Sequence, residues 1–427
     1  MQAIVNDGLS SDLPIDVPPV ADPLTGNALH AKVSTELENE TLVSESSPLD
    51  LGPTEYKDQT IETVELADAE CNEVDRELNE TVATVQALEE YSQLLRTAGA
   101  AGVSPQTVQF LKVGLEHIET TMFDGQMSHA LEQYNPKAEV VSLEDSIKDK
   151  IKAGIARVIK LFKMWLDRIG VYYANYKNGL NRLNAKVKAT RVKLDALEFV
   201  SDVEVKFMNT SGLSADGKSL INDTSLVSGL TQFITADYPD FLLATYKVIR
   251  DELNQADPER TDISELTAKL KDELADITPE IPFNEVAVFP GNVRLKATKN
   301  SNYKLEEDKS LKTLMEHSYV VTDKRMMEIR LKNIEGILDT LNKAVDRSND
   351  VTKTVKQTQD SILKFMKKLT ESDDVSTANL TALLSLLEDN KPSSEAVLTY
   401  LIKTVSQYIA VTEQEIRLMT EAKSRDD

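Results

Sequence analysis

Residues Ser142 to Lys193 read SLEDSIKDKIKAGIARVIKLFKMWLDRIGVYYANYKNGLNRLNAKVKATRVK, and the rest of the chain is organised around this stretch. Apolar side chains recur in it every three or four residues, the period of an α-helix, for about ten turns. Ser142 and Asp145 match an S-x-x-D variant of the capping box, so we expect the helix to begin there. The apolar positions are Ile147, Ile151, Ile155, Val158, Phe162, Trp165, Ile169, Tyr172 or Tyr173, Tyr176, Leu180 and Leu183.

The same stretch is basic in a chain that is otherwise acidic. Asp145 to Lys193 contains 13 Lys and Arg and three Asp, whereas Met1 to Glu144 contains 27 acidic and six basic residues. The net charges are therefore +10 and −21, in a chain whose total is −23. The total argues against non-specific nucleic-acid binding by the whole chain, but it does not decide what one cationic helix does.

Composition indicates a soluble, non-enzymatic protein. The 427 residues are 41% apolar and 28% charged, with no apolar run long enough to span a membrane and no signal-peptide layout, so we expect a cytoplasmic protein. The single cysteine, Cys71, excludes an intrachain disulfide and is expected on an apolar helix face. The local signatures of common phosphate, metal and acyl-transfer sites are missing, and the four histidines share no ligand spacing. We therefore expect no catalytic residues, no metal and no cofactor.

Periodicity predicts a mainly α-helical fold in five segments. These are a disordered acidic tail at 1–58, an acidic helical segment at 59–144, a basic helix plus helical domain at 145–280, a small β-hairpin insertion at 281–321, and a hairpin or bundle of long helices at 322–427.

Local signals place several boundaries within these segments. Ser104 is expected to cap a helix that starts at Pro105, and Asp262 or Ser264 to cap a later one. Residues 198–207 alternate as in a short strand. Residues 285–298 place two alternating runs on either side of Pro290-Gly291-Asn292, which predicts a β-hairpin and the main sheet element.

The basic helix allows three interpretations. In the first, its apolar stripe faces a protein core and its charges form a solvated face. In the second, it lies on a membrane surface with Ile151, Ile155, Phe162 and Trp165 facing lipid and Lys150 among the flanking charges. In the third, it contacts the phosphates of nucleic acid, or another anionic surface, through Lys148, Lys152, Arg157, Lys160, Lys163, Arg168, Arg182, Lys186, Lys188, Arg191 and Lys193.

Three short stretches resemble a known family. They are Ala87 to Tyr91 (ALEEY) and Gly102 to Glu116 (GVSPQTVQFLKVGLE), within residues 65–119, and Phe289 to Leu295 (FPGNVRL). They are similar to segments of internal head proteins, which are structural proteins of the prohead core and inner virion of large, giant-genome tailed bacteriophages. The resemblance is sharp over about 55 residues and diffuse elsewhere.

The resemblance implies a protein of the prohead core that is made in the host cytoplasm and ends inside the capsid. It implies an acidic propeptide, residues 1–144, removed by a prohead protease that cuts after Glu in a small-x-Glu sequence. Ser142-Leu143-Glu144 matches, and the charge step just beyond it singles it out from other matches, among them those that end at Glu36, Glu89, Glu116, Glu132 and Glu198.

The implied partners are other phage head proteins, the protease, further copies of this chain and, after processing, packaged DNA. Two rival hypotheses remain open from the sequence. One is a membrane-active or host-delivered protein that acts through residues 145–176, and the other is a cytoplasmic helical adaptor.

Overall fold

In a computed structural model the chain divides into a first unit, Met1–Ser47, and a compact second unit, Pro48–Asp427. The structure describes residues 49–50, 59–99, 104–122, 136–208, 210–257, 261–279, 281, 287–297, 303–371, 383, 385 and 394–426, all of which belong to the second unit. The predicted acidic tail therefore lies outside the described residues, apart from Leu49–Asp50. That pair was expected to be disordered, but it forms a strand against an open sheet edge.

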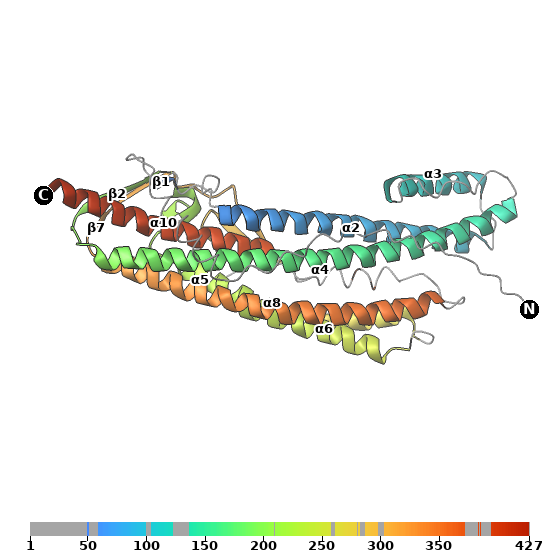
Figure 1. Ribbon diagram of the computed structural model, residues 1–427. Coiled ribbons are helices and arrows are strands. Elements are labelled where there is room, and N and C mark those ends of the chain that lie inside the picture. The colour runs from blue at the N-terminus through green and yellow to red at the C-terminus, as the bar shows by residue number, and fades with distance from the viewer. Residues whose placement is uncertain are drawn as a thin grey trace, which may run out of the picture. The chain divides into compact units, whose positions relative to one another are not determined.

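The long helix α4 (Pro136–Ala196) is the element against which α2 (Gln59–Gly99), α8 (Arg325–Glu371) and α10 (Glu395–Asp426) pack (Figure 1). Every apolar position predicted between Ile147 and Leu183 is buried. Of the two adjacent tyrosines, Tyr172 is fully buried and Tyr173 only partly. The stripe belongs to a hydrophobic core that also includes residues of α2, α8 and α10. The mainly helical fold and the core-facing interpretation of this stripe are thus confirmed.

The start of α4 differs from the prediction. The helix begins at Pro136 instead of Ser142, so Ser142 is not a cap. Proline fits the first helical position because its fixed φ suits the helix and its missing N–H is not needed there. Ser142 to Glu144 therefore lie inside a continuous helix.

The acidic helix α2 runs antiparallel to α4. Glu70 pairs with Arg168 and Glu77 with Arg157, so moving forward along α2 means moving backward along α4. α2 is followed by α3 (Pro105–Met122), whose predicted cap is confirmed because the Ser104 Oγ accepts a hydrogen bond from the Thr107 N–H at 3.1 Å.

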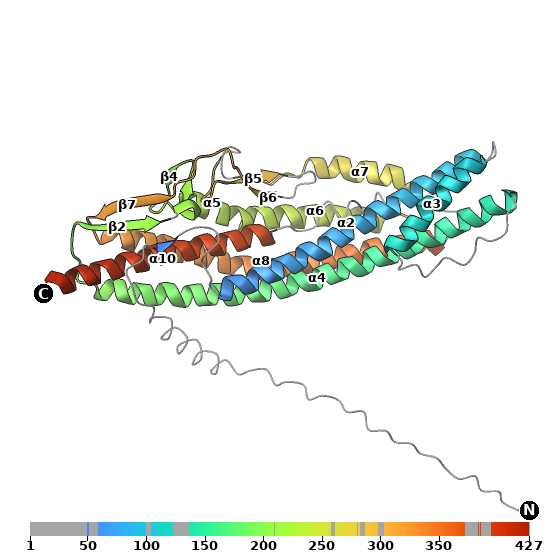
Figure 2. The same cartoon turned by 90° about the horizontal axis from the view of Figure 1, so that it is seen from above.

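The helices after α4 pack on its C-terminal half and on α8. α10 lies beside α4, and both views show it starting near the first turn of α2 (Figures 1 and 2). α6 (Tyr238–Gln255) packs along α8 and is joined by α5 (Ser225–Gln232) and α7 (Ile263–Ala275). Asp262 caps α7 by accepting from the Ser264 N–H at 2.7 Å, as predicted.

The larger sheet joins segments that are distant in sequence. β2 (Val203–Met208), within the stretch expected to contain a strand, pairs antiparallel with β7 (Glu316–Val321) over six residue pairs, and β1 (Leu49–Asp50) adds in parallel. β3 (Ser214–Ala215) and β4 (Lys218–Ser219) form a short second pair, and β5 (Val293–Ala297) and β6 (Tyr303–Glu307) a third.

The predicted hairpin at 285–298 is wrong in its pairing. Pro290-Gly291-Asn292 does turn the chain, with positive φ at Gly291 and Asn292, but among the described residues only Phe289 and Val293 bridge across it. β5 pairs instead with β6, which follows it, and residues 282–286 lie outside the described part. The main sheet element is therefore β2 with β7. A turn signal locates the reversal, but it does not say which neighbouring segment supplies the partner strand.

Candidate functional site

The candidate site is the charged surface of α4 together with the helices that cover it. Eleven basic residues of α4 were nominated from the sequence, and the structure divides them by what surrounds them. Four of them, Arg157, Arg168, Lys186 and Arg191, form ion pairs with glutamates of neighbouring helices.

Two of these four pair with the acidic helix α2. The Arg157 Nη2 lies 2.6 Å from the Glu77 Oε1, and the Arg168 Nη1 lies 2.6 Å from the Glu70 Oε2. All four side chains keep 34–50% of their surface exposed, so each pair contributes only about 0–1 kcal/mol. The main effect of these two pairs is therefore to fix the register of α2 on α4, and they add little to the stability of the contact.

The other two pair with the C-terminal helices. The Arg191 guanidinium donates to both oxygens of Glu335 on α8, at 3.0 and 2.9 Å, and the Lys186 Nζ lies 3.4 Å from the Glu413 Oε2 on α10. Thr190 also donates to Glu413, at 3.1 Å. This end of α4 is therefore tied to its neighbours by specific polar contacts.

The remaining nominated residues point outward. Lys152, Lys160, Lys163, Lys188 and Lys193 are exposed, and no carboxylate of the described residues forms an ion pair with them. Lys148 and Arg182 take part in interactions within the chain. Only part of the nominated set is thus free to meet another molecule.

The four side chains nominated to face a membrane lie in the core. Ile151, Ile155, Phe162 and Trp165 are at most 5% exposed. They could reach lipid only after the helices around them separate, so membrane contact stays a prediction for another state of the chain. Within the described part of the chain, no helix meets the length and hydropathy needed to cross a bilayer.

The small-x-Glu sequences occupy different environments. Glu144 lies in α4 about two turns from its start, and its side chain is outside the described set. Glu89 lies about three turns before the end of α2 and is only 8% exposed, and Glu116 lies within α3. Glu198 follows α4, is exposed and pairs with Lys423, whereas Glu36 and Glu132 are outside the described residues. The ends of a helix open at lower cost than its interior, which favours access to the first turns of α4, where Glu144 lies.

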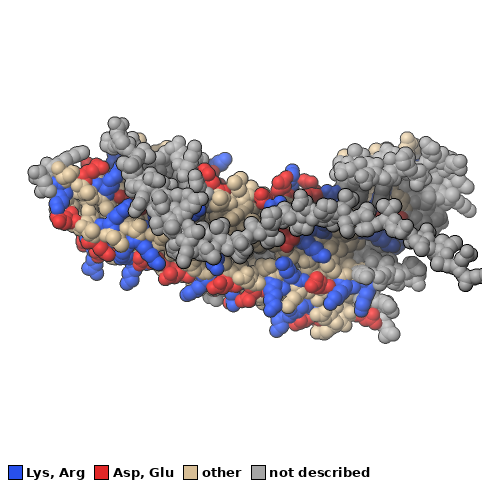
Figure 3. Space-filling model, viewed as in Figure 1, with Lys and Arg blue, Asp and Glu red and all other residues tan. Residues whose placement is uncertain are grey.

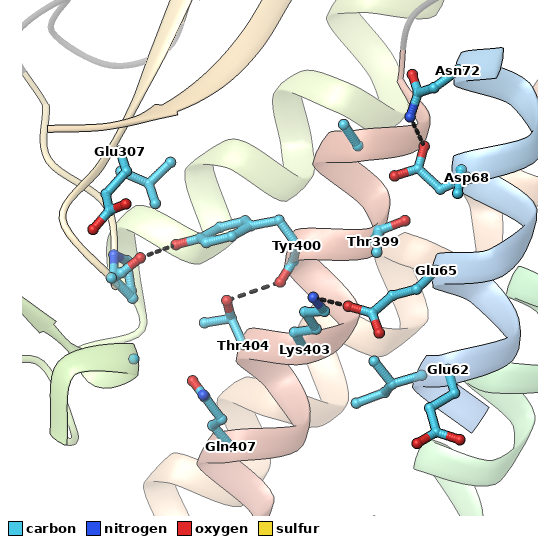
Figure 4. Close-up of a pocket in the computed structure, with 17 residues that line it drawn as sticks. Glu62, Glu65, Asp68, Asn72, Glu307, Thr399, Tyr400, Lys403, Thr404 and Gln407 are labelled. Atoms are coloured by element: carbon cyan, nitrogen blue, oxygen red, sulfur yellow. Dashed lines mark hydrogen bonds and ion pairs between the residues drawn. The ribbon is translucent and has the colours of Figure 1, made fainter. Parts of the chain in front are cut away.

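A cavity of about 830 Å³ lies where α2, α10 and the turn at Pro290 meet (Figure 4). Carboxylates of Glu62, Glu65 and Asp68 line it from α2, and Lys403 of α10 pairs with Glu65 across it. The Tyr400 hydroxyl donates to the Pro290 carbonyl at 2.7 Å on its other side. Burial raises the pKa of the Asp68 carboxyl, although Lys403 opposes the shift. No sequence pattern indicates this cavity, because three segments that are distant along the chain build it.

A second feature missed from the sequence is a buried ion pair between α8 and α10. The side chains of Arg330 and Glu415 are each 1% exposed, with nitrogen–oxygen distances of 2.5 and 3.1 Å. Tyr319 donates to the same carboxylate, and Arg330 also donates to Asn222 and Thr412. The pair joins a strand, two helices and a loop, so it selects one arrangement of the C-terminal half. No local pattern distinguishes these charges from solvated ones.

Comparison with known proteins identifies the family. The family model described as phiKZ-like phage internal head proteins matches residues 54–414. No curated protein and no solved structure matches the chain. The match covers most of the sequence and confirms the resemblance carried by residues 65–119 and 289–295. The chain belongs to the phiKZ-like phage internal head protein family.

Proposed function

We propose that this chain is a structural component of the phage internal head and is made with an acidic propeptide that the prohead protease removes after Glu144. The family match supports the location inside the head. The contact of acidic α2 with basic α4 supports the propeptide, because the segment that would be lost partly neutralises the segment that would remain. Removal of residues 1–144 would also change the net charge of the chain strongly, since these residues carry −21.

The propeptide is a folding partner as well as a source of negative charge. α2 buries ten apolar side chains, from Ile61 to Leu95, against the shared core. At about 1.5–3 kcal/mol for each large side chain, their burial outweighs two exposed ion pairs several-fold. Cutting after Glu144 therefore leaves α2 in place until it unfolds or is degraded further.

Removal of α2 has two consequences for the product that begins at Asp145. The loss of negative charge lowers repulsion toward DNA entering the head. The apolar stripe from Ile147 to Ile169 needs new cover, and other head proteins or further copies of this chain are the proposed source. Helix contacts of the kind that join α4, α8 and α10 would provide it.

Terminal labelling of proteins from purified virions tests the proposal. We expect peptides that begin at Asp145 and almost none from residues 1–144. Glu144→Gln should abolish that terminus, whereas Glu198→Gln, which changes another small-x-Glu sequence, should not. Equal coverage of both parts of the chain in mature virions, or a new terminus elsewhere, contradicts processing at Glu144.

A further inference from the structure

We infer that a row of lysines on the C-terminal half of α8, at the same level as the free lysines of α4, forms a phosphate-binding surface for DNA. This surface is exposed to solvent while α2 is still packed on α4. The row consists of Lys353, Lys356, Lys364 and Lys368. The inference deepens the proposed function, on which it relies only for naming packaged DNA as the ligand.

The four lysines share one face of the helix. At 100° per residue they fall within about 120° of one another, and they extend over about 22 Å along the axis. All four are exposed, and none forms an ion pair with a carboxylate of the described residues. Figure 3 shows Lys and Arg gathered over this end of α8. Asp360 is the one acidic residue on this face between Lys353 and Lys368, so the row stays cationic.

The lysines of α4 lie at the same level along the bundle. Arg191 and Glu335 fix the antiparallel register of α4 and α8. Lys163 lies 28 residues before Arg191, and Lys364 lies 29 residues after Glu335, so both are about 42 Å from that pair. Lys160 and Lys152 continue the row on α4, where Asp149 and Asp167 are the nearby exposed carboxylates.

α2 does not cover these side chains. Arg157 and Arg168, which contact α2, each lie five residues after Lys152 and Lys163, which is about 140° around α4. These four side chains of α4 therefore form two groups. Arginines toward α2 are neutralised inside the chain, and lysines on the outer face are not. The screening length at physiological salt is about 8 Å, so the acidic part of the chain weakly affects this surface.

Nucleic acid fits the surface better than a bilayer does. A helix that binds a membrane surface inserts large apolar side chains beside its lysines. Among the described residues of α8 beyond Ile329, no large apolar side chain is exposed. Rows of flexible ammonium groups with no apolar neighbours are suited to sequence-independent contact with phosphates, accompanied by counterion release.

Titration of the unprocessed full-length chain with a 40-bp duplex of arbitrary sequence, at several salt concentrations, tests the inference. We expect measurable binding whose log–log salt slope becomes shallower by about 3–4 when all four α8 lysines are changed to Gln. Changing the same four to Arg should restore the slope. A matched control with the same charge change at exposed sites on other elements, Lys218, Lys271, Lys304 and Lys309 to Gln, should leave it unaltered.

Three results overturn the inference: no binding by the full-length chain, equal loss in the α8 and control variants, or retention by phosphatidylglycerol vesicles without binding to the duplex. If the processed fragment binds and the full-length chain does not, α2 masks the surface. The proposed processing would then survive while this inference fails. A mature virion protein that retains residues 1–144 contradicts the processing but leaves the lysine surface untouched.

Discussion

Toward its N-terminus α4 is covered by α2, at Arg157 and Arg168, whereas toward its C-terminus it contacts α10 and α8 between Tyr172 and Arg191. The α2 contact consists of apolar packing edged by two exposed ion pairs. The other contact adds hydrogen bonds between Tyr172 and both the Glu395 carbonyl and Thr399, and a bidentate Arg191–Glu335 pair. Beside it, the buried Arg330–Glu415 pair holds α8 and α10 to each other.

The difference between these two contacts indicates at which end of α4 the packed helix can be replaced by another. Apolar packing tolerates different partners with a matching stripe, so another helix could replace α2 if the proposed processing removes it. Buried polar bonds require one arrangement, because a separated partner leaves an unsatisfied group in the core. We therefore expect the C-terminal half to remain a fixed scaffold while the N-terminal half changes partners.

The largest effect is expected where the scaffold holds its buried ion pair. Arg330→Met removes the cation and leaves Glu415 charged in the core, which should lower the free energy of unfolding by about 3–5 kcal/mol. Urea denaturation of the full chain followed by circular dichroism measures it. Lys423→Met breaks the exposed pair with Glu198 and should cost less than about 1 kcal/mol. Equal losses in the two variants would show that the buried pair does not hold the scaffold.

The second largest loss of stability is expected where α2 and α4 lie close together. A Cβ at Gly154 would lie 2.5 Å from the Val85 Cγ2, so Gly154→Ala should force the helices apart at a cost of about 1–3 kcal/mol. Hydrogen exchange of residues 59–99 should rise while that of residues 394–426 stays unchanged. Gly170→Ala is the matched control, because nothing lies within 4 Å of its Cβ and alanine favours the helix by about 1 kcal/mol. Unchanged exchange in Gly154→Ala contradicts the packing.

A smaller effect is expected from one hydroxyl that attaches α10 to α4. Tyr172→Phe removes the hydroxyl that donates to the Glu395 carbonyl at 2.8 Å, and should cost about 0.5–1.5 kcal/mol. Tyr176→Phe makes the same change where the buried hydroxyl has no hydrogen-bond partner among the described residues, and should be neutral or stabilising. Thermal unfolding separates the two. A greater loss from Tyr176→Phe would reverse the assignment.

The smallest effect is a pH dependence at the cavity between α2 and α10. Burial raises the pKa of Asp68 above its ordinary value of 3.8, so the folded chain binds that proton more tightly than the unfolded chain does. The contribution of Asp68 to stability is therefore greatest at acid pH and declines as pH rises from 3.8 through the raised pKa. Asp68→Asn should remove this decline and stabilise α2 at pH 7 by less than about 1 kcal/mol.

Denaturation curves at pH 4 and pH 7 measure the Asp68 effect, with exposed Glu62→Gln in the same cavity as control. If the stability of Asp68→Asn declines from pH 4 to pH 7 as steeply as that of the parent chain, Asp68 is not the source of the decline.

Several features were predictable because they depend on neighbours close in sequence. The stripe from Ile147 to Leu183, the Ser104 cap and the strand within residues 198–207 were all found. Cys71 lies on an apolar face as predicted, and burial raises its pKa to about 12. α4 begins six residues before Ser142, because proline suits the first helical position and the capping pattern at Ser142 lies inside the helix.

By itself, the sequence determined which segments are helical, which face of each is apolar and where the charge changes sign, since all three follow from the periodic order of residues. Only the tertiary structure decided which charges meet. Arg157 pairs with Glu77, Arg330 is buried with Glu415, and Lys353, Lys356, Lys364 and Lys368 remain exposed, although all of these basic residues look alike in the sequence. The physical reason is that pairing and desolvation depend on side chains brought together from elements far apart along the chain.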